Sequence, residues 1–256
     1  MSDLINYTLH LADNNLILTQ RNGDWCGHGP ILEQDIAITN ITLDLIGQSR
    51  NFYQYAAQLI NQSTDQPIQP ATEDSLAYLR KEREFKNCLL TEQENGDWAQ
   101  TIGRQFFYSA FQYLQYEKLQ HSTDEQLAGI AAKSLKEVTY HLTWSSEWVV
   151  RLGDGTEESH HRMQKAINEL WAYTGELFMP APYEAEMIKE GIAPDAAALK
   201  ESWLQKVTEV FEEATLSVPE KVFMQSGGKT GIHSEKLGYL LTDLQYLQRT
   251  YPGAEW

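Results

Sequence analysis

The feature that most constrains this chain is a long run of helical periodicity over residues 124–152. Within it Leu127, Ala131, Ser134, Val138, His141, Ser145 and Val149 recur at intervals of three and four residues. That spacing predicts one long helix whose inward face carries all seven side chains. The pattern therefore places a histidine in the core of the fold.

The turn of helix around His141 departs from a pattern found in four-helix metal proteins. Proteins that hold two metal ions through carboxylates use Glu-x-x-His pairs, because residues three apart lie on one helical face. Here Val138 stands where the glutamate would be. The chain has the pattern of a metal-enzyme scaffold whose metal-binding groups have been replaced.

Composition narrows the class of protein. A chain of 256 residues with 42% hydrophobic content and no linker-like stretch predicts one domain over residues 1–256. The formal charge of −16 argues against nucleic-acid and anionic-membrane partners, which need clustered cations. Two cysteines without Cys-x-x-Cys spacing, a start without a signal-peptide pattern and no long apolar run predict a cytoplasmic location outside the membrane.

The remaining pattern is helical throughout, so the predicted fold class is all-α. Further helices are expected over residues 4–20, 33–61, 76–91, 98–116, 158–178, 196–216 and from about 234 to 249. Pro67 and Pro70 mark a connection, and residues 180–195 are expected to be irregular. The helix over residues 33–61 is predicted to have an inward-facing stripe, with Gly47 allowing close approach of a neighbouring helix or ring. The residues of this stripe are Ile36, Asn40, Leu43, Gly47, Phe52, Tyr55 and Leu59.

The helix expected over residues 98–116 contains no carboxylate. If it is one of four central helices, it cannot supply the acidic ligand that a pair of iron ions needs. This is the strongest argument from the residues alone against a di-iron site.

Two polar segments have both a structural and a functional interpretation. Residues 80–87 form the densest basic run, but Glu82 and Glu84 dilute it, so a solvated helix face explains it without any function. The glycine-rich residues 226–234 precede a helix and offer N–H groups and a lysine, which would suit a phosphate or equally a tight turn.

Several motifs in order resemble one family over essentially the whole chain. They are residues 22–30 (NGDWCGHGP), 43–51 (LDLIGQSRN), 227–233 (GGKTGIH) and the end of the chain, residues 252–256 (PGAEW). They resemble the C subunits of the phenylacetyl-CoA epoxidases, the monooxygenase complexes of bacterial phenylacetate catabolism. The resemblance implies a ferritin-like helical bundle with additional C-terminal helices.

The resemblance also implies a role within a complex. It implies a non-catalytic structural companion of a homologous catalytic subunit that holds the di-iron centre, together with the other subunits of the epoxidase. The complex would carry out ring 1,2-epoxidation of phenylacetyl-CoA.

The same resemblance implies where the catalytic relative has its six metal ligands. These positions are Asn15, Leu45, Gln48, Ser109, Val138 and His141 in this chain. Five of the six ligands are replaced, so we expect no metal and no cofactor in this chain.

Two alternatives remain beside a structural role. An autonomous metal-dependent oxidoreductase would use Glu137 and His141, which face the same way, with Asp44 or Asp13 approaching from neighbouring helices. Alternatively, a protein that contacts substrate without transforming it would use cations on the phosphates of coenzyme A, or on an acidic partner. The candidates for that contact are Arg83, Lys86, Asn87 and Lys229.

Overall fold

The computed structural model describes residues 2–63 and 70–254, and these are 73% helical with no strand among them. The prediction of an all-α, ferritin-like helical fold is confirmed. Within the described ranges no helix is both long and apolar enough to cross a membrane. Pro67 of the expected connection and the last two residues of the terminal motif, Glu255 and Trp256, lie outside the described residues.

The longer helices lie close to their predicted positions. The α-helices are α1 (Ser2–Gly23), α2 (Leu32–Ser63), α3 (Glu73–Tyr78), α4 (Trp98–Leu119), α5 (Glu125–Gly153), α6 (Glu157–Leu170), α7 (Pro182–Lys189), α8 (Lys200–Glu213) and α9 (Glu235–Thr250). Single 3-10 turns cover Glu82–Glu84, Trp171–Tyr173, Gly175–Phe178, Ala196–Leu199 and Gly228–Thr230.

Contacts group the chain into two compact units. The first contains Met1–Glu92, Ala181–Met187 and Gly227–Trp256, and the second contains Gln93–Pro180 and Ile188–Ser226. The assignment of residues 1–256 to one domain stays a prediction.

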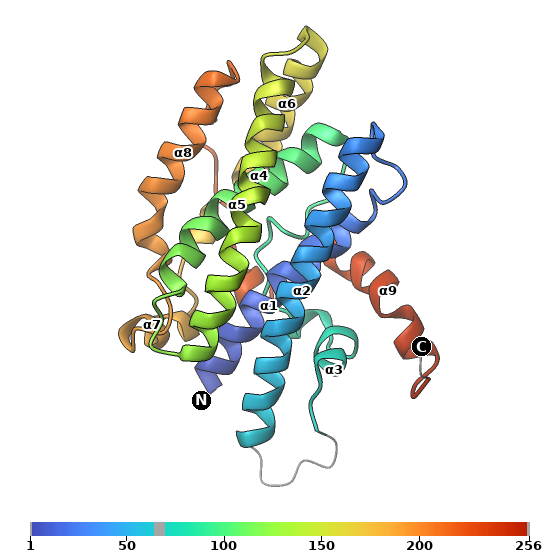
Figure 1. Ribbon diagram of the computed structural model, residues 1–256, viewed down its shortest axis with the longest axis vertical. Helices are drawn as coiled ribbons and strands as arrows, with labels where there is room; N and C mark the ends of the chain where they lie inside the picture. The colour runs from blue at the N-terminus through green and yellow to red at the C-terminus, as the bar shows by residue number, and fades with distance from the viewer. Residues whose placement is uncertain (1, 64–69, 255–256) are drawn as a thin grey trace. The chain divides into compact units, whose positions relative to one another are not determined.

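In the first unit α1 packs along α2, and α3 packs against both α2 and α9 (Figure 1). The long helix α1 buries every residue from Tyr7 to Thr19, including the polar ones. A helix buried all round needs partners for its polar side chains. This requirement shapes the site described below.

In the second unit α4 packs against α5, α6 and α8 (Figure 1). The start of α4 is fixed by Asp97, whose side chain accepts a hydrogen bond from the Gln100 N–H at 3.0 Å, and Asp124 caps α5 in the same way at Leu127. The Trp203 indole N–H donates to the Phe107 carbonyl at 3.0 Å, which satisfies its polar edge. Aromatic rings fill the core: Phe106, Phe107, Trp171, Trp203 and Phe211.

The predicted inward stripe of α5 is confirmed. All seven residues, from Leu127 to Val149, are buried. Regular three- and four-residue spacing along a single helix gave an unambiguous inward face.

The helix expected over residues 76–91 is wrong. Helix α3 ends at Tyr78, and the chain continues through a 3-10 turn at Glu82–Glu84 into an extended segment. The reason is long-range bonding: the Lys86 N–H donates to Asp13 at 2.8 Å and the Cys88 N–H donates to Asn14 at 2.8 Å. Partners on α1 replace the bonds that a helix would have made.

The predicted inward stripe of α2 is wrong over its first half. Ile36, Leu43 and Gly47 are exposed, and nothing in the chain lies within 4 Å of a β-carbon placed at Gly47. The helix has apolar side chains on two faces, and periodicity alone does not tell which face is covered. The buried face there consists instead of Ile38, Ile41, Leu45, Gln48 and Ser49.

Two further boundaries differ. The helix expected over residues 158–178 ends at Leu170 and continues as 3-10 turns, and the irregular stretch expected over residues 180–195 contains α7. Pro182 begins α7, which is a favourable helix start because the ring lacks the N–H that would be unpaired there.

Candidate functional site

Three of the six positions implied by the family resemblance lie in the first unit. Asn15 on α1 and Leu45 and Gln48 on α2 are all buried. The Asn15 amide donates to the Leu11 carbonyl of its own helix at 3.1 Å. None of these three side chains carries a charge.

The other three positions lie in the second unit and are also buried. Ser109 is on α4, and Val138 and His141 are on α5. The Ser109 hydroxyl accepts a hydrogen bond from Gln105 at 2.8 Å, one turn earlier on the same helix.

The chemistry of these six side chains does not fit a pair of iron ions. They offer two amides, one hydroxyl, one imidazole and two aliphatic groups, whereas two bridged cations need several carboxylates to neutralise them. In the ranges that the structure covers, no group of three or more His, Cys, Asp and Glu side chains is placed to hold a metal ion. Of the carboxylates proposed for an alternative site, Glu137 is half-buried on α5, and Asp13 is engaged elsewhere.

Asp13 is the centre of a buried charge cluster in the first unit. It receives hydrogen bonds from Arg80 Nη1 at 3.1 Å, from the Tyr53 hydroxyl at 2.6 Å and from the Lys86 backbone at 2.8 Å. Burial and the Asp13 charge together raise the pKa of Tyr53 well above its usual value, so the phenol stays neutral. The cluster fixes the start of the extended segment against α1.

On either side of Asp13, α1 holds the same segment through neutral groups. The His10 Nδ1 lies 2.7 Å from the Lys86 carbonyl, and Asn14 accepts from the Cys88 N–H. Burial, and then the positive charge of Lys229, lower the pKa of His10 to about 4. His10 is therefore neutral at pH 7, which suits a ring donating to a carbonyl.

Glu92 ties the end of the extended segment to the loop before α9. Its carboxylate lies 2.8 Å from His233 Nδ1 and accepts from the Ser234 N–H at 2.8 Å and from Asn87 at 2.9 Å. Burial lowers the pKa of His233, but the hydrogen bond and charge of Glu92 outweigh that effect, and the net shift is upward. His233 and Glu92 thus form a buried hydrogen-bonded pair, and the upward shift in the pKa of His233 favours its protonated form.

Four side chains were predicted to contact coenzyme A or a partner, and the structure places them differently from one another. Lys229 is buried and pairs with Glu184 at 3.0 Å, and Asn87 is buried against Glu92. Arg83 is exposed, and Lys86 is half-buried with its ammonium 5.4 Å from the centre of the Tyr183 ring. Of the four, Arg83 and Lys86 are the ones on accessible surface.

The glycine-rich loop is a tight turn packed against the basic segment. Gly231 has a φ of +83°, and a β-carbon there would lie 2.3 Å from the Arg83 carbonyl. Close backbone approach explains the glycine without a phosphate. Of the two interpretations of residues 226–234, the tight turn accounts for the glycine at this position.

Sequence reasoning missed most of the buried polar residues that bind the extended segment after α3 to α1 and to the loop before α9. One signal was present, because His10, Asp13 and Asn14 are spaced to lie on one face of α1. Three polar residues on one face of a long, largely apolar helix indicate a buried polar contact. The residues missed are Arg80, Glu92, Glu184 and His233, and Asp13 was predicted only as a possible metal ligand.

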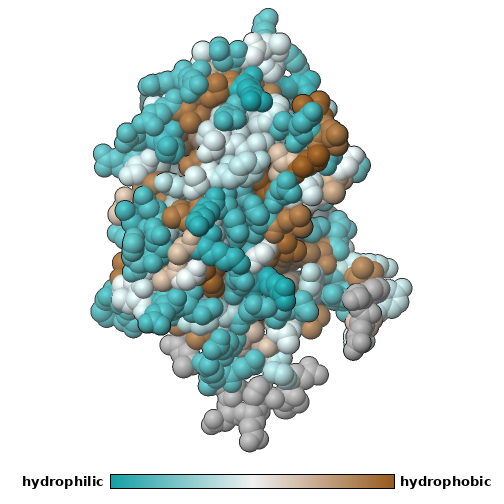
Figure 2. Space-filling view, viewed as in Figure 1, coloured by the Kyte–Doolittle hydropathy of each residue, from teal (hydrophilic) through white to brown (hydrophobic). Residues whose placement is uncertain are grey.

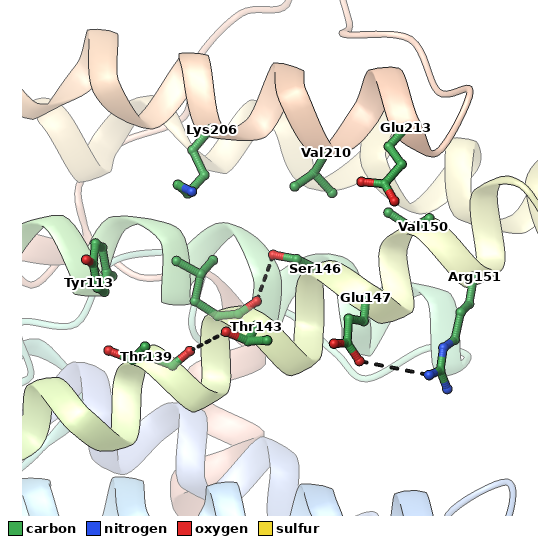
Figure 3. Close-up of a pocket in the computed structure, with 11 residues that line it drawn as sticks. Tyr113, Thr139, Thr143, Ser146, Glu147, Val150, Arg151, Lys206, Val210 and Glu213 are labelled. Atoms are coloured by element: carbon green, nitrogen blue, oxygen red, sulfur yellow. Dashed lines mark hydrogen bonds and ion pairs between the residues drawn. The ribbon is translucent and has the colours of Figure 1, made fainter.

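The second unit has a groove of about 530 Å³ between α5 and α8, with Tyr113 of α4 at one end (Figure 3). Its walls carry Lys206 and Glu213 from α8 and the Glu147–Arg151 pair from α5. None of the predicted site residues lines this groove.

Comparison with known proteins gives two findings. The profile of the family described as "Phenylacetic acid catabolic protein" matches residues 1–256. The chain is also 48% identical, over 256 residues and the full length of both chains, to the protein named as the C subunit of 1,2-phenylacetyl-CoA epoxidase in Escherichia coli (strain K12). The family resemblance seen in the sequence motifs is confirmed: the chain belongs to the phenylacetic acid catabolic protein family.

Proposed function

We propose that this chain is the non-catalytic structural subunit of a phenylacetyl-CoA epoxidase. It pairs with a homologous catalytic subunit, and the complex carries out ring 1,2-epoxidation of phenylacetyl-CoA in phenylacetate catabolism. The observation that carries the proposal is the 48% identity, over the full length of both chains, to a protein named as the C subunit of such an epoxidase. A protein named as a subunit works with others, and here these are the catalytic subunit and the remaining components of the complex.

The donor chemistry supports assigning the di-iron centre to the catalytic subunit. In this chain Leu45 and Val138 occupy two of the six implied ligand positions, and both are fully buried. Apolar groups there avoid a buried carboxylate without a cation, which costs several kcal/mol. Replacing ligand carboxylates with apolar side chains in the core therefore favours a structural role for this chain over a redox role.

The accessible cations support a finer role at the substrate. Arg83 and the half-buried Lys86 are suited to the phosphates of coenzyme A. Charge reversal at Arg83 raises the apparent KM of the complex for the thioester if this contact is made. An unchanged KM would show that Arg83 does not contact the thioester.

We place the complex in the cytoplasm, in keeping with two free cysteines, of which Cys26 is exposed.

Separate metal analysis of the two partners tests the assignment. The chain is co-expressed with the tagged catalytic subunit, the complex is purified and dissociated, and iron is measured in each partner. We expect iron in the catalytic partner only, and epoxidation only when both chains are present.

Two matched measurements complete the test. His141→Ala in this chain is expected to leave the iron content of the complex unchanged, and this chain expressed alone is expected to contain no stoichiometric iron. Two irons per chain, or epoxidation by this chain alone, would contradict the proposal.

A further inference from the structure

His233 and Glu92 form a titratable pair that the fold encloses, because both side chains are 0% exposed. Figure 2 shows hydrophilic side chains over much of the face that it draws, as expected for a chain with a net charge of −16. Charges at such a surface are screened by water and salt, so their titration changes the fold little. A change of charge at an enclosed pair acts on the structure itself.

Both nitrogens of the His233 ring face oxygen acceptors. Nδ1 lies 2.8 Å from the Glu92 carboxylate, and Nε2 lies 3.0 Å from the Phe85 carbonyl. A neutral imidazole has one N–H and can donate to only one of these oxygens, whereas an imidazolium donates to both. The geometry therefore fits the charged ring, and a neutral ring leaves one acceptor without its hydrogen bond.

The charges that face the ring favour its proton. Burial by itself lowers the pKa of His233, but the hydrogen bond and charge of Glu92 outweigh burial, and Asp13 on α1 adds a weaker attraction. The net shift of the pKa is upward. At the start of α9, Glu235 is exposed and Lys236 is half-buried, so both lie nearer to solvent than the pair does.

The other ionisable groups on neighbouring elements keep their charge over the range in which the ring titrates. Lys229, in the same loop, pairs with Glu184 of α7 at 3.0 Å. Arg21 of α1 donates to the backbone carbonyl of Glu92 at 2.8 Å, and a guanidinium stays charged throughout. The pKa of His10 on α1 is about 4, which lies below this range. The His233 ring is thus the group whose charge changes here.

The ring joins the loop before α9 to the segment after α3. The N–H and the hydroxyl of Ser234 both donate to the second oxygen of Glu92, each at 2.8 Å. Next to them, the backbone of Gly231 lies against the Arg83 carbonyl. Loss of the ring proton removes one of the two bonds from His233 and the positive charge beside Glu92. Both changes weaken the attachment of the loop.

We propose that His233 is a pH-sensitive switch: while protonated it holds the loop of residues 227–234 on the segment of residues 85–92, and it releases that loop when the ring loses its proton. The loop is held at lower pH, because the pKa of His233 is higher in the folded chain than in the unfolded one. The stabilisation is complete below the unfolded value of about 6.5 and is lost as pH rises through the folded value. The switch does not depend on the proposed function.

Amide hydrogen exchange of the native chain tests the switch. Protection factors of the Ile232 and Ser234 amides, corrected for the intrinsic rise of exchange with pH, are measured at pH 7 and at about pH 9. They are expected to fall by about tenfold or more, because a buried hydrogen bond to a charged group is lost. The amides of α5, in the second unit, are the internal reference and are expected to keep their protection.

Three variants separate the ring from its surroundings. His233→Gln carries an amide that does not titrate, so it is expected to lower loop protection at pH 7 and to abolish the difference between the two pH values. Glu92→Gln removes the charge that favours the proton and is expected to release the loop at a lower pH than in the native chain. His161→Gln, at an exposed position of α6, is the matched control and is expected to keep the native difference. Circular dichroism verifies that each variant stays helical.

The charge of the ring is read independently by ¹⁵N NMR of the chain labelled at histidine, with His233→Gln identifying the signal. The native ring is expected to carry protons on both nitrogens at pH 7. A neutral ring at pH 7, loop protection that does not change with pH, or a His233→Gln chain that keeps the native difference would each overturn the proposal. The two pH values of the native chain decide the matter even where a variant fails to fold.

Discussion

The Arg80 guanidinium and the Asp13 carboxylate form a buried ion pair between residues 67 positions apart, with Arg80 Nη1 3.1 Å from Asp13 Oδ2. Arg80 also donates to the Leu76 and Glu84 carbonyls. One side chain thus joins α1 to the end of α3 and the turn that follows. The pair is the anchor of the extended segment.

Arg80→Met is expected to lower the free energy of unfolding by about 3–5 kcal/mol, because it leaves Asp13 charged and buried without its cation. Urea denaturation followed by circular dichroism measures the change. Arg162→Met is the control, since Arg162 and its partner Glu158 are both more than half exposed. A loss for Arg80→Met no larger than for the control would show that the cluster does not stabilise the fold.

The second unit was more predictable from sequence than the first. On α5 the stripe from Leu127 to Val149 has one apolar face, so periodicity identifies the core directly. Segment 79–92 has strong local helix formers, yet its backbone bonds to Asp13 and Asn14 instead. Local propensity is worth a fraction of a kcal/mol per residue and loses to several buried hydrogen bonds made to distant partners.

The sequence placed some candidate site residues in the core and left the surroundings of others unpredicted. The six positions implied by the family resemblance are all buried, as core positions should be. The burial of Lys229 was not predictable, because its partner Glu184 lies 45 residues away on α7, in a stretch expected to be irregular. A lysine in a glycine-rich loop is expected to be exposed until its distant carboxylate is known.

The buried His10 ring makes the free energy of unfolding depend on pH. Its pKa is lowered to about 4 in the folded chain, below the usual 6.5, so the unfolded chain binds the proton between these values. The free energy of unfolding is expected to fall as pH drops from 6.5 to 4, by roughly 3 kcal/mol from this group. Denaturation at a series of pH values measures it. His10→Gln is expected to flatten this slope, and His161→Gln, an exposed residue of α6, to keep it.

A carboxylate at Val138 would restore one of the implied metal ligands in a core that lacks the other carboxylate ligands. Val138→Glu is expected to destabilise the chain by about 3 kcal/mol or more, because the new group is buried without a cation. Tyr140→Glu, two residues along the same helix and 47% exposed, is the control and should change stability little. Equal stability of the two variants would indicate that Val138 is not enclosed.

Gly231 is required by its backbone. Gly231→Ala is expected to cost roughly 1–3 kcal/mol, because φ is +83° and the methyl would meet the Arg83 carbonyl. Gly129→Ala, in an open helical position of α5, is expected instead to stabilise by about 0.5–1 kcal/mol. Thermal unfolding of both variants gives the comparison. A stabilising Gly231→Ala would contradict the tight turn.

Glu92 meets His233 across 141 positions of sequence, within a unit assembled from three separate stretches of the chain. During synthesis the first helices leave the ribosome long before the loop that neutralises Glu92 exists. Until then the polar groups of that region have only water as a partner. The first unit therefore completes its folding after translation is nearly over, and a chain cut short before residue 227 would lack the part that closes it.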